Sequence, residues 1–155
     1  MIKITALALA AVSALITGSS PESWTASLAG KNGSMVTGTA TAEAVGNDST
    51  RVTISVRGAP SSAMLPWHIH NGPCSATTTV VGAEAGYPKL EVSGTGTAEG
   101  SAVLAVKLSR TASYAVQVHR DPAPTMKDDS KSSTPGSDVL SCGDLKPANP
   151  DVPQQ

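Results

Sequence analysis

Two of the chain's three histidines lie two residues apart in the stretch MLPWHIHNGPC, residues 64–74. In an extended segment successive side chains point to opposite faces, so His68 and His70 project the same way, roughly 7 Å apart. His119 ends the stretch YAVQVH, where alternation puts it on the face opposite the two valines. Imidazole nitrogens are good ligands for copper and zinc. The sequence therefore predicts that His68, His70 and His119 converge on one metal ion.

The elements that must position these histidines are strands. In TRVTISVR, residues 50–57, apolar side chains alternate with polar ones, which is typical of a half-buried strand. Similar alternation predicts strands over 37–43, 91–97, 101–108 and 113–119, with turns at 31–33, 45–49 and 98–100. No segment after the first eighteen residues has a convincing helical period. The expected fold is all-β, an antiparallel sandwich or barrel.

The two ends of the chain differ in composition from the middle. Residues 1–20 contain Lys3, an apolar run and small residues, which predicts a signal peptide whose run is too short for a stable membrane span. Residues 21–145 have the size of one ordinary domain. Residues 146–155 are rich in proline and are expected to be disordered or extended. We expect an exported protein, periplasmic or extracellular.

Composition limits the partners and the core. Lys3 is the one charged residue in the predicted signal peptide, so the mature chain has a net charge of about −2 and no basic block. Nucleic acid is therefore not an expected partner.

Phenylalanine is absent and aromatic residues make up 3%, so the core must be built mainly from aliphatic side chains. In an exported chain, two cysteines favour one disulfide over free thiols or a metal pair.

Together these residues resemble the Cu/Zn superoxide dismutase family over roughly residues 24–145. The stretch GKNGSMVTG, residues 30–38, resembles the first hairpin of the family. PWHIHNGPC, residues 66–74, resembles the strand with two copper histidines that is followed by the disulfide cysteine. VQVH, residues 116–119, resembles the strand with the later copper histidine, and LSCG, residues 140–143, the segment with the partner cysteine.

The resemblance implies a Greek-key antiparallel β-sandwich or barrel with one intrachain disulfide, Cys74–Cys142. It also implies one copper ion per chain, with His68, His70 and His119 as the ligands. Superoxide would then be a candidate partner of the site.

The chain also departs from the family pattern. The family needs a bridging histidine and further zinc ligands, yet no histidine lies between Cys74 and His119. Glu84 and Glu91 could not rebuild a nitrogen-rich zinc site, so no zinc is expected. The family's arginine that guides superoxide is replaced by Val139.

The segment from Arg120 to Ser141 resembles the family's electrostatic loop in position and approximate length. It carries four aspartates against three basic residues, so it would not focus anions strongly. One of these aspartates is expected to fix the tautomer of a metal-bound histidine, although the sequence does not single one out. Met64 and Met126 are alternative thioether ligands, but a lone methionine more often fills a gap.

Three functional hypotheses follow. The first, which we favour, is an exported copper-binding protein whose dismutase activity is reduced or lost, because Val139 removes anion guidance and no bridging imidazole supplies protons. The second is an active copper-only superoxide dismutase. The third is a metal-free interaction domain of the chordin type, which shares the H-x-H strand and would not require a pairing of Cys74 with Cys142.

Overall fold

The structure, a computed structural model, describes residues 21–121 and 138–148. This part of the chain is built from strands, with one short 3₁₀ turn. The elements are β1 (Ser23–Gly30), β2 (Thr37–Val45), β3 (Ser49–Arg57), β4 (Met64–Leu65), β5 (Trp67–Asn71), η1 (Glu84–Gly86), β6 (Leu90–Glu91), β7 (Ala98–Leu104), β8 (Tyr114–His119) and β9 (Val139–Pro147). The predicted all-β class is confirmed.

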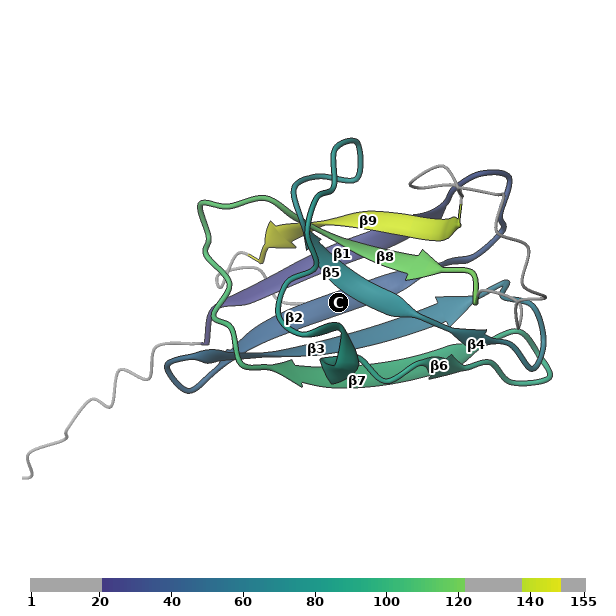
Figure 1. Cartoon of the computed structure of the whole chain (residues 1–155), viewed down its shortest axis with the longest axis horizontal. Coiled ribbons are helices and arrows are strands. Elements are labelled where there is room, and N and C mark those ends of the chain that lie inside the picture. The colour runs from purple at the N-terminus through teal and green to yellow at the C-terminus, as the bar shows by residue number, and fades with distance from the viewer. Residues whose placement is uncertain (1–20, 122–137, 149–155) are drawn as a thin grey trace, which may run out of the picture.

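Seven strands form one antiparallel sheet in the order β5-β8-β9-β1-β2-β3-β7, while β4 and β6 pair separately. The sheet curls on itself, so that β5 and β8 lie in front of β2 and β3 (Figure 1). Three connections join strands that are not neighbours in this sheet: from β3 to β5 through β4, from β5 to β7 through β6, and from β7 to β8. The core fills the space enclosed by the curled sheet.

Strand β3 illustrates how alternation builds this core. Val52, Ile54 and Val56 are buried while the residues between them are exposed, as the sequence predicts. Thr50 is the polar member of the buried row. Its hydroxyl donates to a backbone carbonyl oxygen at 2.8 Å and accepts the Leu108 N–H at 3.3 Å, so the buried oxygen is satisfied.

Two tryptophans replace phenylalanine as the largest core side chains, Trp24 and Trp67. The Trp67 indole N–H donates to the Pro88 carbonyl oxygen at 2.7 Å. A Cβ at Gly100, in β7, would lie 2.6 Å from Cδ2 of Leu90 and 3.6 Å from Nε1 of Trp67. A larger residue there would force the buried Leu90 side chain to shift, whereas Trp67 would be in ordinary contact.

Two strands predicted from alternation, residues 91–97 and 101–108, have the wrong bounds. Of the predicted strand 91–97 only the first residue is in a strand, because Ser93 closes a turn with Thr97. The Ser93 amide donates to the Thr97 carbonyl oxygen at 2.8 Å, and the two hydroxyls lie 2.9 Å apart. Residues 98–100, predicted as a turn, begin β7, which ends at Leu104 rather than at residue 108.

The ends of the domain are described only in part. Strand β9 continues through Lys146 and Pro147, which sequence analysis assigned to the tail. The predicted signal peptide, residues 122–137 and residues 149–155 lie outside the described residues. Among the residues that are described, no helix is long and apolar enough to cross a membrane.

Candidate metal centre

Strand β5 carries His68 and His70 and is paired on both edges. One edge pairs with β8, and the other meets residues 78–81, where the Val81 N–H donates to the Ile69 carbonyl oxygen at 2.8 Å. Pro66, which has no N–H to donate, separates β4 from β5. Backbone hydrogen bonds on both edges therefore hold the two imidazoles in place.

His119 reaches the same point from the end of β8. The pairing between β8 and β9 shifts there, since Val118 pairs with Ser141 whereas His119 pairs with Val139. A bulge of this kind redirects a side chain and is common beside functional sites. The His119 N–H also donates to the Pro66 carbonyl oxygen at 2.8 Å, which fixes the end of β8 to the start of β5.

The three histidines converge. One ring nitrogen from each lies within 4.8 Å of those of the other two, and the ring centroids are 5.5 to 5.9 Å apart. Nitrogens bound to one ion at 2.0–2.1 Å in tetrahedral geometry are about 3.4 Å apart, so small side-chain adjustments bring them into ligating positions. The three side chains lie together, and the group could hold a metal ion.

Hydrogen bonds select the nitrogens that face this point. Nδ1 of His70 lies 3.2 Å from the Thr78 carbonyl oxygen, and Nδ1 of His119 lies 3.3 Å from Oδ2 of Asp138. Each Nδ1 must carry the proton to donate to an oxygen, so each Nε2 keeps its lone pair. Both Nε2 atoms are buried and have no hydrogen-bond partner. Orientation by a carbonyl or carboxylate through the second nitrogen is typical of metal-binding histidines.

Asp138 is thus the aspartate that orients a histidine, a role that sequence analysis assigned to residues 120–141 without choosing one. The choice depends on the register shift between β8 and β9: it pairs His119 with Val139, and the preceding residue, Asp138, then lies beside the ring, its carbonyl oxygen accepting the Arg120 N–H at 2.7 Å. Asp128 and Asp129 lie outside the described residues.

Tyr87 supports His68 and was missed as part of the site, because its sequence context resembles any core aromatic. The two rings pack edge to face with centroids 5.2 Å apart. The Tyr87 hydroxyl donates to the Val81 carbonyl oxygen at 2.7 Å. Burial raises the pKa of Tyr87 to about 12, which keeps this donor protonated.

The environment favours neutral imidazoles. Burial lowers the pKa of His68 below 6.5, and the neighbouring His119 and His70 lower it further. Burial also lowers the pKa of His119, although Asp138 opposes this effect. Because a metal ion binds the unprotonated ring, both shifts leave the site ready to bind at neutral pH.

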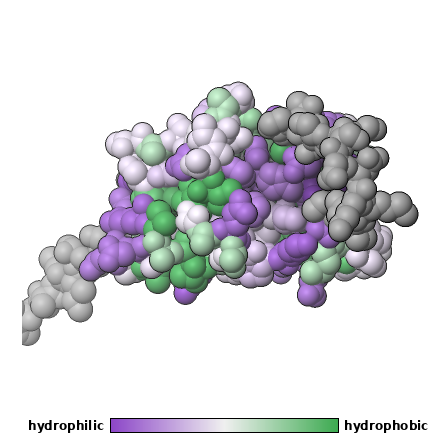
Figure 2. Space-filling view, viewed as in Figure 1, coloured by the Kyte–Doolittle hydropathy of each residue, from purple (hydrophilic) through white to green (hydrophobic). Residues whose placement is uncertain are grey.

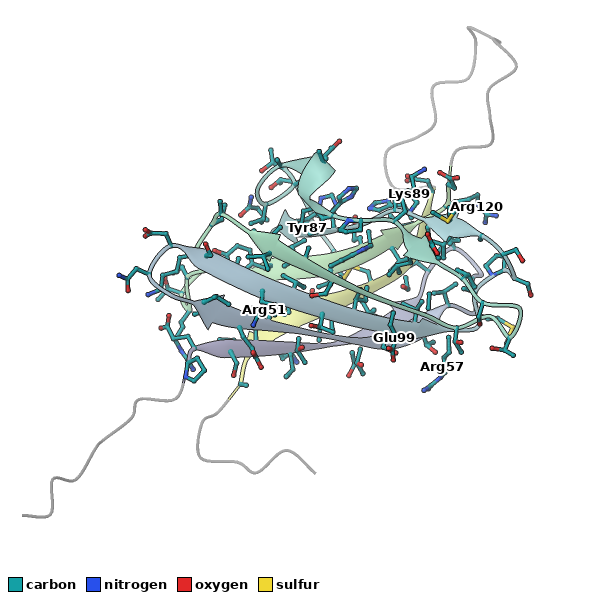
Figure 3. The ribbon with its side chains drawn as sticks, turned by 90° about the horizontal axis from the view of Figure 1, so that it is seen from below. Arg51, Arg57, Tyr87, Lys89, Glu99 and Arg120 are labelled. Atoms are coloured by element: carbon teal, nitrogen blue, oxygen red, sulfur yellow. A yellow bond between two sulfur atoms is a disulfide. The ribbon has the colours of Figure 1, made fainter. Side chains whose placement is uncertain are left out.

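The cluster opens into a depression of about 250 Å³ whose charged lining comprises Glu84, Arg120 and Asp138. Hydrophilic side chains gather on this face of the molecule beside a more apolar area (Figure 2). Tyr87, Lys89 and Arg120 lie along it, and Arg57 and Glu99 lie on the opposite side (Figure 3). Lys89 pairs with Asp121 at 2.7 Å, so its charge is already balanced.

The disulfide Cys74–Cys142 is present, and its two Cα atoms are 5.9 Å apart. The part of the chain that the structure describes contains no free cysteine. It ties the loop that follows β5 to β9, which also pairs with β8. The Cys74 N–H donates to Oδ1 of Asp144 at 2.7 Å, strengthening the same link. The disulfide therefore secures both strands that carry histidines, and it is compatible with an oxidising compartment.

Two other residues singled out from the sequence lie away from the depression. Val139 is 6% exposed and packs with Ala115 beside the disulfide. Met64, in β4, is 40% exposed and does not line the depression. Met126 lies outside the described residues.

Comparison with known proteins adds no assignment. No model of a protein family matches the chain, and no curated protein matches it. The functional argument therefore depends on the geometry of the histidine cluster and its surroundings.

Proposed function

We propose that this is an exported copper-binding protein with a superoxide dismutase-like Greek-key fold. It holds one copper ion per chain through His68, His70 and His119. Its dismutase activity is reduced or lost. The observation that carries the proposal is the pair of buried Nε2 atoms without partners, each on a ring whose Nδ1 is already fixed. Buried polar atoms without partners are costly, and a bound cation would remove that cost.

Copper is favoured over zinc by the donor set and by affinity. Three neutral imidazoles with an open position suit both oxidation states of copper, and copper(II) binds nitrogen sites more tightly than other divalent first-row metals. Copper would supply one-electron redox chemistry. The antiparallel sheet with its three connections between non-adjacent strands and the Cys74–Cys142 disulfide support the family resemblance that suggested copper.

Reduced dismutation is supported by the charges around the depression. Among the described residues Arg120 is the one cation that lines it, against the carboxylates of Glu84 and Asp138. These charges attract a metal cation, and with copper(II) bound they leave a net charge of only +1 to draw superoxide in. Within the described residues no fourth histidine is present to couple proton transfer to the metal.

An active copper-only superoxide dismutase is the second candidate, and Arg120 is the observation that favours it. Its side chain lines the depression beside the histidines and offers an anion one favourable contact. A metal-free chordin-like domain is less well supported. It explains neither the two buried Nε2 atoms without hydrogen-bond partners nor the Cys74–Cys142 disulfide.

The test is a copper titration of the mature protein and of His119→Ala, with Arg51→Ala as the control on the opposite face. The wild type and the control should bind one copper per chain, and His119→Ala should bind far more weakly. Copper binding by His119→Ala at wild-type affinity would contradict the proposed site. Superoxide decay near the diffusional ceiling of about 10⁹ M⁻¹s⁻¹ in the copper-loaded wild type would favour the active dismutase instead.

A further inference from the structure

Glu84 stands at the mouth of the histidine cluster. It begins η1, where the Tyr87 N–H donates to the Glu84 carbonyl oxygen at 3.1 Å. Tyr87 follows η1 and is buried against His68, which fixes the turn beside the histidines. Glu84 is exposed and lines the same depression as His68, His70 and His119.

The charge of Glu84 suits this position. Glu84 lines the same depression as the three histidines and brings a carboxylate to it. Among the residues that the structure describes, no hydrogen bond or ion pair engages the Glu84 carboxylate. This carboxylate, which has no partner among the described residues, is available to a cation bound between the three imidazoles.

We propose that the Glu84 carboxylate is the fourth ligand of the metal ion, an inference that rests on the copper site proposed above. Its oxygens lie outside the group of nitrogens within 4.8 Å, but Glu84 is exposed and its side chain can rotate toward the open position. A carboxylate is a hard oxygen donor, so it stabilises copper(II) more than copper(I). The same contact closes the position that a substrate would need, which favours retention of the metal over turnover.

The experiment compares copper(II) and copper(I) affinities, measured by competition with chelators, in the wild type, Glu84→Gln and Glu91→Gln. Glu91 is the matched control, since it is an exposed glutamate in β6 beside Arg57 and Glu99, which lie on the side opposite Tyr87 (Figure 3). Glu84→Gln should weaken copper(II) binding about tenfold or more and leave copper(I) binding unchanged. Glu91→Gln should change neither.

Two further measurements separate ligation from simple charge attraction. The copper(II) paramagnetic resonance spectrum should change in Glu84→Gln, because a charged carboxylate ligand is replaced by a neutral amide, and should not change in Glu91→Gln. Glu84→Asp keeps the charge but shortens the side chain by one methylene, so it should weaken copper(II) binding as well. Circular dichroism on each variant checks that the fold is retained.

The outcomes that overturn the inference differ from those that overturn the copper site. A Glu84→Gln protein with wild-type copper(II) affinity and spectrum would refute the fourth ligand while leaving the three-histidine site intact. Full affinity in Glu84→Asp, or equal losses for both oxidation states in Glu84→Gln, would also refute it. A wild-type protein that binds no copper would refute both proposals.

Discussion

Removal of the Asp138 carboxylate should weaken metal binding without removing a ligand. Oδ2 of Asp138 lies 3.3 Å from Nδ1 of His119 and holds the ring so that Nε2 faces the cluster. Groups that orient a metal-bound histidine typically contribute 10–100-fold in affinity. Since the Asp138 side chain is 54% exposed, solvent screens the interaction and we expect the lower end, about tenfold or about 1.4 kcal/mol.

Asp138→Ala and Asp138→Asn divide this effect between charge and geometry. Asparagine keeps an oxygen that accepts the Nδ1 proton, so Asp138→Asn should lose less affinity than Asp138→Ala. Asp121→Ala is the control, because it removes an aspartate that pairs with Lys89 rather than with a histidine, and such surface pairs contribute little. Copper affinity is measured by chelator competition at pH 8.

Two results would refute this reasoning. If Asp138→Ala bound copper as tightly as the wild type, the contact with His119 would have no part in holding the ring. If Asp121→Ala lost as much affinity as Asp138→Ala, the effect would come from the net charge of this face and not from orientation of His119.

Three other predictions concern stability. Denatured, unreduced protein should contain no free thiol. Replacement of Cys74 and Cys142 by serine should lower the free energy of unfolding, measured by urea denaturation, by about 4 kcal/mol, because the disulfide closes a loop between residues 68 positions apart. Because burial lowers the pKa of His68 and His119 below 6.5, the unfolded state takes up protons at a higher pH than the folded state. The free energy of unfolding of the metal-free protein should therefore be constant above pH 6.5 and fall below it. Urea titrations at pH 7.5 and 5.5 would measure this fall, and a variant with both histidines replaced by glutamine should lack it. Tyr87→Phe should lower the free energy of unfolding by about 1–2 kcal/mol, since a buried carbonyl loses its donor while the ring packing remains; an unchanged urea midpoint would contradict this.

Much of the fold follows from alternation, and the failures have a physical cause. Strands β2 and β3 have one face in the core and one in solvent, so their sequences alternate and were predicted closely. Strand β9 is buried on both faces from Val139 to Gly143, because the loop that carries Cys74 covers its second face. Such a strand has no alternation to detect. The turn at Ser93–Thr97 was predicted as a strand because its hydroxyl residues also alternate, although they bond to one another.

The histidines of the candidate site were easier to predict than the groups that orient them. His68 and His70 share a face through parity alone, and His119 ends an alternating strand. Asp138 depends on a bulge, and the partner of His70 is a backbone carbonyl that no side-chain pattern encodes. Glu84 was weighed from the sequence only as a zinc ligand; its position over the cluster depends on the 3₁₀ turn.

The charges of the depression decide what the three imidazoles are suited to do. Two carboxylates and one guanidinium line it, so before a metal ion binds, the described lining carries a net charge of −1 with neutral histidines. Such a site gains a cation readily and repels an anion weakly. A bound divalent ion changes the charge of the described lining from −1 to +1, a sum that already includes Glu84. This single positive charge attracts a diffusing anion weakly, because salt at physiological strength screens it beyond about 8 Å. If the Glu84 carboxylate is also the fourth ligand, it occupies the position that superoxide would need. The cluster is therefore better suited to hold a cation than to turn over a diffusing anion.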